Sequence, residues 1–220
     1  MKKKKRKFSK RFTFKELQNE DTPQKIVYAT LQEIAANGLT GTTTKGISER
    51  ADLSTGIIHH YFDTKDNLIY AAYVYLVLDL HQCTLNIFKH EKDPKTRLLA
   101  LIRMNFATVH ISPEARDVWV HFWADAVHDE RINRLLNIYY RRYRSNLAHA
   151  FREILHDYDK SRKAAQLLLA TIHGVWFTHR FANSPSENER AIELVEKQLD
   201  MLLENYQKPD LAENSHSKAA

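Results

Sequence analysis

The stretch from Thr43 to Lys65 reads TTKGISERADLSTGIIHHYFDTK and decides the fold. It predicts two short helices with a tight turn between them at residues 52–54. The apolar residues of each helix lie four positions apart and share the inward face: Ile47 and Ala51 in the first helix, Ile58 and Phe62 in the second. A hydroxyl at Ser54 or Thr55 can cap the second helix. This pattern predicts a helix-turn-helix, whose second helix fits the DNA major groove.

The residues of this stretch also resemble those of a known protein family. The residues that carry the resemblance are Ile47, Ala51, Leu53, Ser54, Gly56, Ile58, Tyr61, Phe62 and Lys65. They look like the DNA-binding domain of the TetR family of repressors, and STGIIHHYF resembles its choline-responsive BetI type. Asp52 stands where the family usually has Gly, at a position expected to need a positive φ. Asp tolerates such a φ better than most other residues, so we expect the turn to form.

The resemblance implies which residues meet DNA. Those expected to face base edges are exposed by helical spacing: Thr55, Gly56, Ile57, His59 and His60. Those expected at the phosphates or at the capped helix starts are Thr43, Thr44, Ser54, Tyr61 and Lys65. For Tyr61 a plain packing role in the core is the alternative.

Composition predicts an all-α protein. The chain has 220 residues, 43% of them hydrophobic, with 5 Gly and 5 Pro, which suits helices better than many strands and turns. Cys83 is the single cysteine, so no disulfide framework is expected and a reducing compartment is favoured. The longest uncharged apolar stretch, Leu68 to Leu78, has 11 residues and is too short to span a bilayer. No apolar run follows the Lys-rich start, so a signal peptide is not predicted.

The positive charge belongs to the first residues. Residues 1–11 carry eight basic residues and no acidic one, whereas the other 209 carry 25 basic and 27 acidic residues. Such an arm can bind any polyanion through counterion release. A disordered, solubilising arm is the alternative, and composition alone also allows a nuclear signal. The resemblance favours the cytoplasm of a bacterium, with the protein on the nucleoid.

Glycine, proline and polar residues at helix ends predict where the chain divides into domains and helices. We expect a flexible basic arm at 1–20, a helix-turn-helix domain of three helices at 21–66, a larger helical ligand-binding and dimerisation domain at 67–206, and a disordered tail at 207–220. Within these domains the predicted breaks between helices come at five places: Asn37-Gly38, Lys92-Asp93-Pro94, Ser112-Pro113-Glu114, His156–Ser161 and Asn183–Ser186.

The second half extends the resemblance to residues 20–206. Three segments look like the BetI-type ligand-binding domain: DVWVHFWADAVHDE, RLLNIYYRRYRSNLAHAFREIL and HGVWFTHR. The resemblance implies choline or a similar cation as the effector and glycine betaine metabolism as the regulated process. A quaternary ammonium has no donor hydrogens, so a protein holds it by aromatic faces and a nearby negative charge.

Aromatic residues and one acid form the predicted effector site. They are Trp119, Phe122, Trp123, Asp125, Tyr139, Tyr143, Trp176 and Phe177. An ordinary core is the alternative for such an aromatic stripe. His173 joins this set because it stands where the family usually has Asp, and a neutral or positive side chain there would weaken cation binding. A different effector, such as a fatty acyl compound or a hydrophobic drug, therefore stays open.

Other kinds of site are not predicted. None of the twelve histidines has a trusted metal-ligand spacing, and no Gly-rich phosphate loop or Gly-x-Ser-x-Gly turn is present. We therefore expect no metal, no cofactor and no enzyme.

The sequence as a whole predicts a homodimeric repressor that binds double-stranded operator DNA and a small effector, with no membrane partner. The residues predicted to pair across the dimer axis are Leu168, Ile172, Ile192, Val195, Leu199 and Leu202. The alternative from another class is a helical protein that binds polyanions or membrane surfaces through its basic arm.

Overall fold

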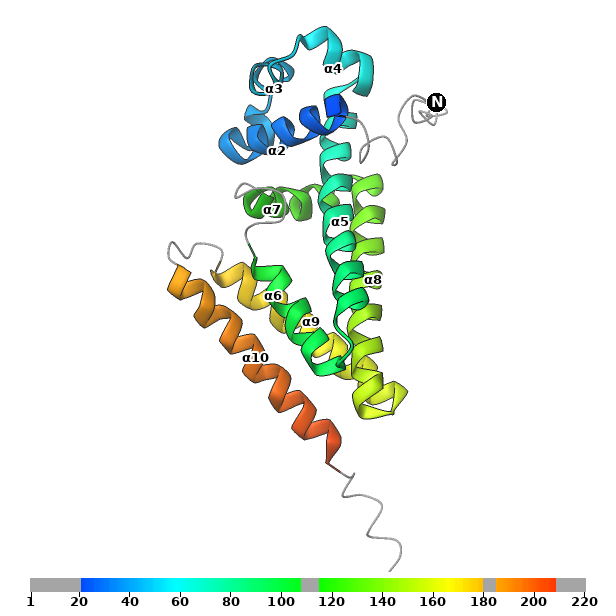
Figure 1. Cartoon of the computed structure of the whole chain (residues 1–220). Coiled ribbons are helices and arrows are strands. Elements are labelled where there is room, and N and C mark those ends of the chain that lie inside the picture. The colour runs from blue at the N-terminus through cyan, green and yellow to red at the C-terminus, as the bar shows by residue number, and fades with distance from the viewer. Residues whose placement is uncertain (1–20, 108–114, 180–184, 209–220) are drawn as a thin grey trace, which may run out of the picture. The chain divides into compact units, whose positions relative to one another are not determined.

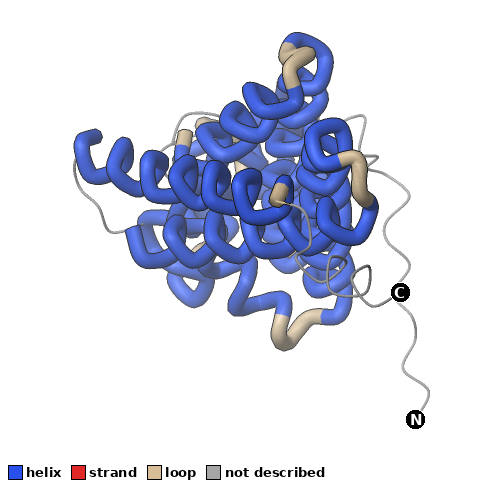
Figure 2. The backbone as a smooth tube through the Cα atoms, turned by 90° about the horizontal axis from the view of Figure 1, so that it is seen from below, coloured by secondary structure: helices blue, strands red, loops and turns tan. Residues whose placement is uncertain are grey.

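A computed structural model describes residues 21–107, 115–179 and 185–208 (Figure 1). These residues form helices joined by short loops, and they contain no strand (Figure 2). The helices are α2 (Asp21–Gly41), α3 (Thr44–Ala51), α4 (Thr55–Phe62), α5 (Lys65–His90), α6 (Pro94–Phe106), α7 (Ala115–Ala126), α8 (Glu130–Leu155), α9 (Tyr158–His179) and α10 (Pro185–Gln207). The predicted all-α class is confirmed. The basic arm and most of the predicted tail lie outside the described residues.

The chain forms two compact units. Unit 1 takes residues up to 81 together with 108–137, and unit 2 takes 82–107 together with the residues from 138 onward. The long helices α5 and α8 each begin in unit 1 and continue into unit 2. The unit boundaries therefore differ from the predicted domain boundary at residue 66, because α7 and the first turns of α8 group with the N-terminal helices. The division by function stays a prediction.

In unit 1, α2 packs on both α3 and α7. Its apolar residues Ile26, Leu31 and Ile34 are fully buried. Gly38 interrupts α2 with a φ of 66°, and Thr42 closes the break by donating from both its N–H and its hydroxyl to the Gly38 carbonyl. The predicted end at Asn37-Gly38 is thus a kink, since one further helical turn follows it.

A buried carboxylate fixes α3 on α2. Glu33 of α2 is 4% exposed, and its Oε2 accepts from Nε of Arg50 at 2.6 Å. Gly46, in the first turn of α3, leaves room for this carboxylate. A Cβ on Gly46 would lie 2.1 Å from Glu33 Oε1, far inside contact distance.

In unit 2, α10 packs on α9 and α6, and α6 also packs on α9. The six residues predicted to pair across a dimer axis lie in this packing and are at most 5% exposed in the single chain. That prediction was wrong in its residues, because this stripe packs against helices of the same protomer. Ion pairs close the α6–α10 contact: Lys95 Nζ to Asp200 Oδ1 and Arg103 Nε to Glu196 Oε1, both 2.8 Å.

A buried arginine closes the loop between α5 and α6. Arg97 pairs with Glu153 of α8 at 2.7 Å, donates to the Glu91 and Lys92 carbonyls, and lies 4.7 Å above the Phe88 ring. These two carbonyls lie in the loop after His90, the last residue of α5, so the guanidinium supplies the donors that this loop needs.

Several predicted boundaries moved. The predicted turn His156–Ser161 is shorter, because Asp157 caps the next helix through the Lys160 N–H at 2.8 Å and α9 begins at Tyr158. The break at Asp93-Pro94 is confirmed, with Asp93 as the N-cap of α6. The predicted start at Ser112-Pro113-Glu114 lies outside the described residues.

By length and composition alone, α5 could cross a membrane, because an 18-residue window within it has a mean hydropathy of 1.3. This differs from the prediction made from the apolar stretch Leu68–Leu78, which is too short to span a bilayer. Half of that window is buried inside the protein, as in the core helix of a globular domain.

Replacing Gly46 by Ala should destabilise the fold by about 1–3 kcal/mol, because the new methyl group collides with the buried Glu33 carboxylate. Thermal melting checks this. Gly56→Ala is the matched control, since its Cβ would meet no atom closer than Ser54 Oγ at 3.7 Å. That control should be neutral or stabilising by up to about 1 kcal/mol. Equal melting temperatures for the two variants would contradict the tight Glu33 contact.

Candidate DNA interface and effector site

The helix-turn-helix is built by two caps and one left-handed residue. Thr43 Oγ1 accepts from the Gly46 N–H at 2.9 Å, and Ser54 Oγ accepts from the Ile57 N–H at 3.3 Å. Asp52 has φ 50° and ψ 51°, and its N–H bonds to the Glu49 carbonyl at 3.2 Å. The predicted positive φ is confirmed, and it turns the chain between α3 and α4.

The face of α4 that is predicted to read DNA is open to solvent. Ile58 and Phe62 are buried, whereas Thr55, Gly56, Ile57, His59 and His60 are exposed. His59 Nδ1 lies 3.2 Å from the Asp63 carbonyl, which ties its ring to the end of the helix. The His60 ring meets the Tyr61 ring edge-on at 5.3 Å. This face presents hydroxyl and imidazole groups beside an N-terminal helix end, groups that suit base edges and phosphates.

The flanking residues have mixed surroundings. Thr43 and Ser54 are exposed, and both hydroxyls already serve as caps. Thr44 and Tyr61 are half-buried. Lys65 is also half-buried, and its Nζ donates to the Thr42 carbonyl at 3.0 Å, a structural contact that sequence reasoning missed.

The first group of effector candidates is the α7 cluster: Trp119, Phe122, Trp123 and Asp125 of α7 with Tyr73 of α5. Trp119 lies 5.3 Å from Phe122 and 6.4 Å from Trp123, measured between ring centroids. Phe122 is fully buried and stacks on Tyr73 at 4.6 Å. Trp119 and Trp123 are half-buried, so part of each indole can be reached.

Asp125 supplies the carboxylate of the α7 cluster. Its Oδ2 accepts from the Tyr73 hydroxyl at 3.0 Å. Burial raises the pKa of Asp125, and the hydrogen bond from Tyr73 works in the opposite direction. The pKa of Tyr73 is raised by burial and by the Asp125 charge, so Tyr73 stays a protonated donor near neutral pH.

The second group is the α8–α9 cluster: Tyr139, Tyr140 and Tyr143 of α8 with His173 of α9. Tyr139 and Tyr143 are stacked at 6.0 Å, and His173 meets Tyr140 edge-on at 5.2 Å. Tyr143 donates to the Leu101 carbonyl at 3.2 Å and accepts from the Asn105 amide. Burial lowers the pKa of His173 to about 4, so this ring is neutral at pH 7.

The remaining candidates lie further along α9. Trp176 is half-buried, and Phe177 is 50% exposed, so Phe177 is not part of a closed cage within one protomer. Sequence reasoning missed Tyr73 and Asn105. Tyr73 lies within an apolar run in which no residue pointed to an effector site. Tyr140 was also missed, although it directly follows the candidate Tyr139 in the sequence.

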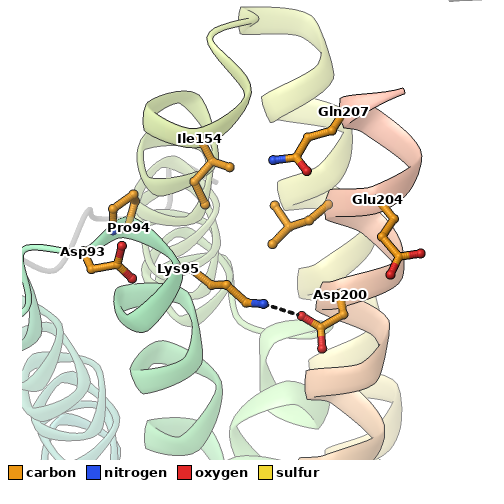
Figure 3. Close-up of a pocket in the computed structure, with 8 residues that line it drawn as sticks. Asp93, Pro94, Lys95, Ile154, Asp200, Glu204 and Gln207 are labelled. Atoms are coloured by element: carbon orange, nitrogen blue, oxygen red, sulfur yellow. Dashed lines mark ion pairs between the residues drawn. The ribbon is translucent and has the colours of Figure 1, made fainter. Parts of the chain in front are cut away.

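A groove of about 430 Å³ lies in unit 2, between the ends of α6, α8 and α10 (Figure 3). Its polar lining includes Asp93, Lys95, Asp200 and Glu204, and its apolar lining includes Ile154. Lys95 and Asp200 neutralise each other across it. No aromatic residue lines this groove, and it contains none of the effector candidates.

Among the described residues, no group of three His, Cys, Asp or Glu side chains is close enough to hold a metal ion.

Two family models match the chain. Residues 26–72 match the tetR family of bacterial regulatory proteins, and residues 94–204 match the C-terminal domain of BetI-type transcriptional repressors. These ranges contain the helix-turn-helix and most of the effector candidates.

Relatives and solved structures agree with these matches. The HTH-type transcriptional regulator BetI of Burkholderia cenocepacia is 36% identical over 179 residues, which cover 81% of this chain and 92% of that protein. A transcriptional regulator from Pseudomonas aeruginosa PAO1 shares the fold, with a TM-score of 0.71 and 24% identity over 84% of this chain and 91% of that one. A regulator from Saccharomonospora viridis in complex with choline has a TM-score of 0.71 and 17% identity over 81% and 95%. These proteins are transcriptional regulators and not enzymes, and the chain belongs to the TetR family of DNA-binding transcriptional repressors, with a C-terminal domain of the BetI type.

Proposed function

We propose that this repressor reads its operator with the exposed face of α4, controls genes of choline and glycine betaine metabolism, and leaves the DNA when a small cation binds. The observation that carries the DNA half is the exposed row Thr55, Gly56, Ile57, His59 and His60 on a capped helix whose opposite face is buried. Thr43, Thr44, Ser54, Tyr61 and Lys65 are proposed to border this row at the phosphates. The protein acts in the cytoplasm, on the nucleoid.

The repressor is proposed to work as a homodimer through α9 and α10. Large apolar side chains remain exposed on these two helices in the single chain: Leu167 at 48%, Phe177 at 50%, Leu194 at 51% and Met201 at 63%. They replace the buried stripe that the sequence suggested, because a second copy can only cover what one protomer leaves open. A dimer of this kind sets half-sites ~34–36 Å apart, or a multiple of that distance.

Release is proposed as a population shift. An effector that binds one arrangement of the dimer better favours it, and that arrangement spaces the two α4 helices wrongly for the operator.

The proposed binding site for the cation is the α7 cluster. It combines two reachable indoles with a carboxylate, the groups that hold a quaternary ammonium. The Saccharomonospora viridis regulator was solved with choline, and the shared fold makes a similar effector a natural candidate here. The neutral His173 lends no negative charge to the α8–α9 cluster, which favours the α7 cluster for a cation. The same neutrality supports the second candidate, a repressor of this family that answers a neutral hydrophobic ligand.

Replacing His60 by Ala should weaken binding to operator DNA by ~1–3 kcal/mol and relax the preference at one base step, because the variant has no imidazole to bond a base edge. An operator sequence is first obtained by selecting, from a pool of random DNA duplexes, those that the wild-type protein binds. Binding to random DNA should change little. His90→Ala, at the exposed end of α5, is the matched control. An equal loss on both DNAs would mean that His60 touches only the backbone.

Deleting residues 2–11 should weaken binding to all duplexes alike and flatten its salt dependence, by roughly 0.9 in log–log slope for each phosphate that the arm had neutralised. The measurement is affinity between 50 and 200 mM salt, on the selected operator and on random DNA, with melting curves beside it. An unchanged slope would show that the arm does not reach DNA. Loss of all binding, with folding intact, would favour a protein that binds polyanions through its arm alone.

Replacing Trp119 or Trp123 by Ala should weaken choline binding by roughly 30-fold, since a desolvated cation–π contact is worth up to ~2 kcal/mol. Phe at either position should retain part of the affinity. Trp176→Phe tests the third indole among the candidates, and a site made by the α7 cluster predicts that it changes the affinity little. Calorimetry measures the affinity for choline. Melting curves show whether the Trp side chain instead belongs to the core, because a buried Trp→Ala would lower the free energy of unfolding by ~3–5 kcal/mol. If millimolar choline does not bind while a neutral apolar compound releases the DNA, the second candidate is correct.

A further inference from the structure

Tyr73 faces the proposed effector site from the interior of unit 1. Its side chain is fully buried, its hydroxyl donates to Asp125 Oδ2 at 3.0 Å, and its ring lies nearly parallel to Phe122, 13° apart. Tyr73 is therefore held on α7 by a stack and by a hydrogen bond at the same time. A hydrogen bond from a hydroxyl to a carboxylate is about twice as strong as one between neutral groups.

The groups around Asp125 explain why this bond matters. Burial opposes the charge of Asp125, and Asp129, which follows α7, opposes it too. The Tyr73 hydroxyl on α5 favours the charge, as do His121 on α7 and His128 after it when they are protonated. Tyr73 is the largest of these favourable influences on the pKa of Asp125, and its own raised pKa keeps its hydroxyl protonated near neutral pH.

The hydrogen bond does not compete with a quaternary ammonium. A carboxylate offers about four lone-pair sites on two oxygens, and Tyr73 uses one of them. A trimethylammonium group needs no hydrogen bond from the protein and is attracted by charge and by ring faces. The bond to Tyr73 therefore uses only part of the Asp125 carboxylate and does not compete with a cation for it.

We propose that Tyr73 is a positioning residue that holds Asp125 as an ionised, oriented carboxylate for the cationic effector. This inference rests on the proposed function, because the cation it serves is the effector named there. Tyr73 itself lies behind Asp125 and Phe122 and acts through them.

The first test needs no effector. The carboxyl carbon of Asp125 is followed by NMR against pH in the ligand-free protein, and Asp125→Asn identifies the signal. Tyr73→Phe keeps the ring and its stack and removes only the hydroxyl, so the Asp125 midpoint should rise by about one pH unit. The matched control is Tyr75→Phe on the same helix, whose hydroxyl accepts from the Gln24 amide at 2.9 Å. An unchanged midpoint in Tyr73→Phe overturns the proposal.

The second test follows choline by calorimetry between pH 5 and pH 8. The cation binds the ionised carboxylate, so wild-type affinity should fall as the pH drops through the Asp125 midpoint. Tyr73→Phe should move this fall to higher pH, and its loss relative to the wild type should approach about tenfold below the wild-type midpoint, while Tyr75→Phe should follow the wild type. A pH profile that is the same in Tyr73→Phe overturns the positioning role. A wild-type protein that binds no choline at any pH overturns the proposed effector and this role of Asp125, whereas the carboxyl titration still decides whether Tyr73 holds the charge.

Discussion

The position of the recognition helix depends on the buried carboxylate of Glu33. This carboxylate occupies the space that Gly46 leaves at the first turn of α3 and pairs with Arg50 near its last turn. A buried carboxylate that loses its partner costs several kcal/mol, so α3 cannot slide along α2 without a large penalty. The left-handed Asp52 and the Ser54 cap then carry this fixed position across the turn into α4. The orientation of the DNA-reading face is thus set on α2.

The same helix α2 also packs on α7, so an effector at the proposed site on α7 has a physical route to the helix-turn-helix. A Cβ on Gly38, at the kink, would lie 3.8 Å from Cε1 of His121, and His121 is on α7 with Trp119, Trp123 and Asp125. In the proposed mechanism, a cation that shifts α7 changes the surface on which α2 rests, and the Glu33 contact passes this change to α3. Every step of this coupling lies within unit 1.

Local rules made the helix-turn-helix predictable, whereas tertiary packing decided what sequence reasoning missed. Caps, the apolar spacing of α3 and α4, and the positive φ of Asp52 depend on a few neighbouring residues, so the pattern sufficed. Leu168 and Val195 were expected at an interface between helices, but spacing alone cannot say whether the partner helix belongs to the same protomer. For the same reason it could not show which aromatic candidates contact each other within unit 1 or within unit 2, or that Tyr73 faces Asp125.

His173 stands where the resemblance to the BetI type implies an Asp, so in the proposed mechanism the negative charge for a cation comes from α7. Aromatic faces attract a cation by about 0.5–2 kcal/mol each, too little to discriminate strongly against a neutral ligand of the same shape. Discrimination therefore needs a negative charge close to the rings. The imidazole of His173, with its pKa lowered to about 4, cannot supply one, and the tyrosines around it keep their protons because burial raises the pKa of Tyr139 and Tyr143. Asp125 is the acid among the candidate residues, so in the proposed mechanism the choice between a cation and a neutral effector depends on whether the environment of Asp125 keeps it ionised.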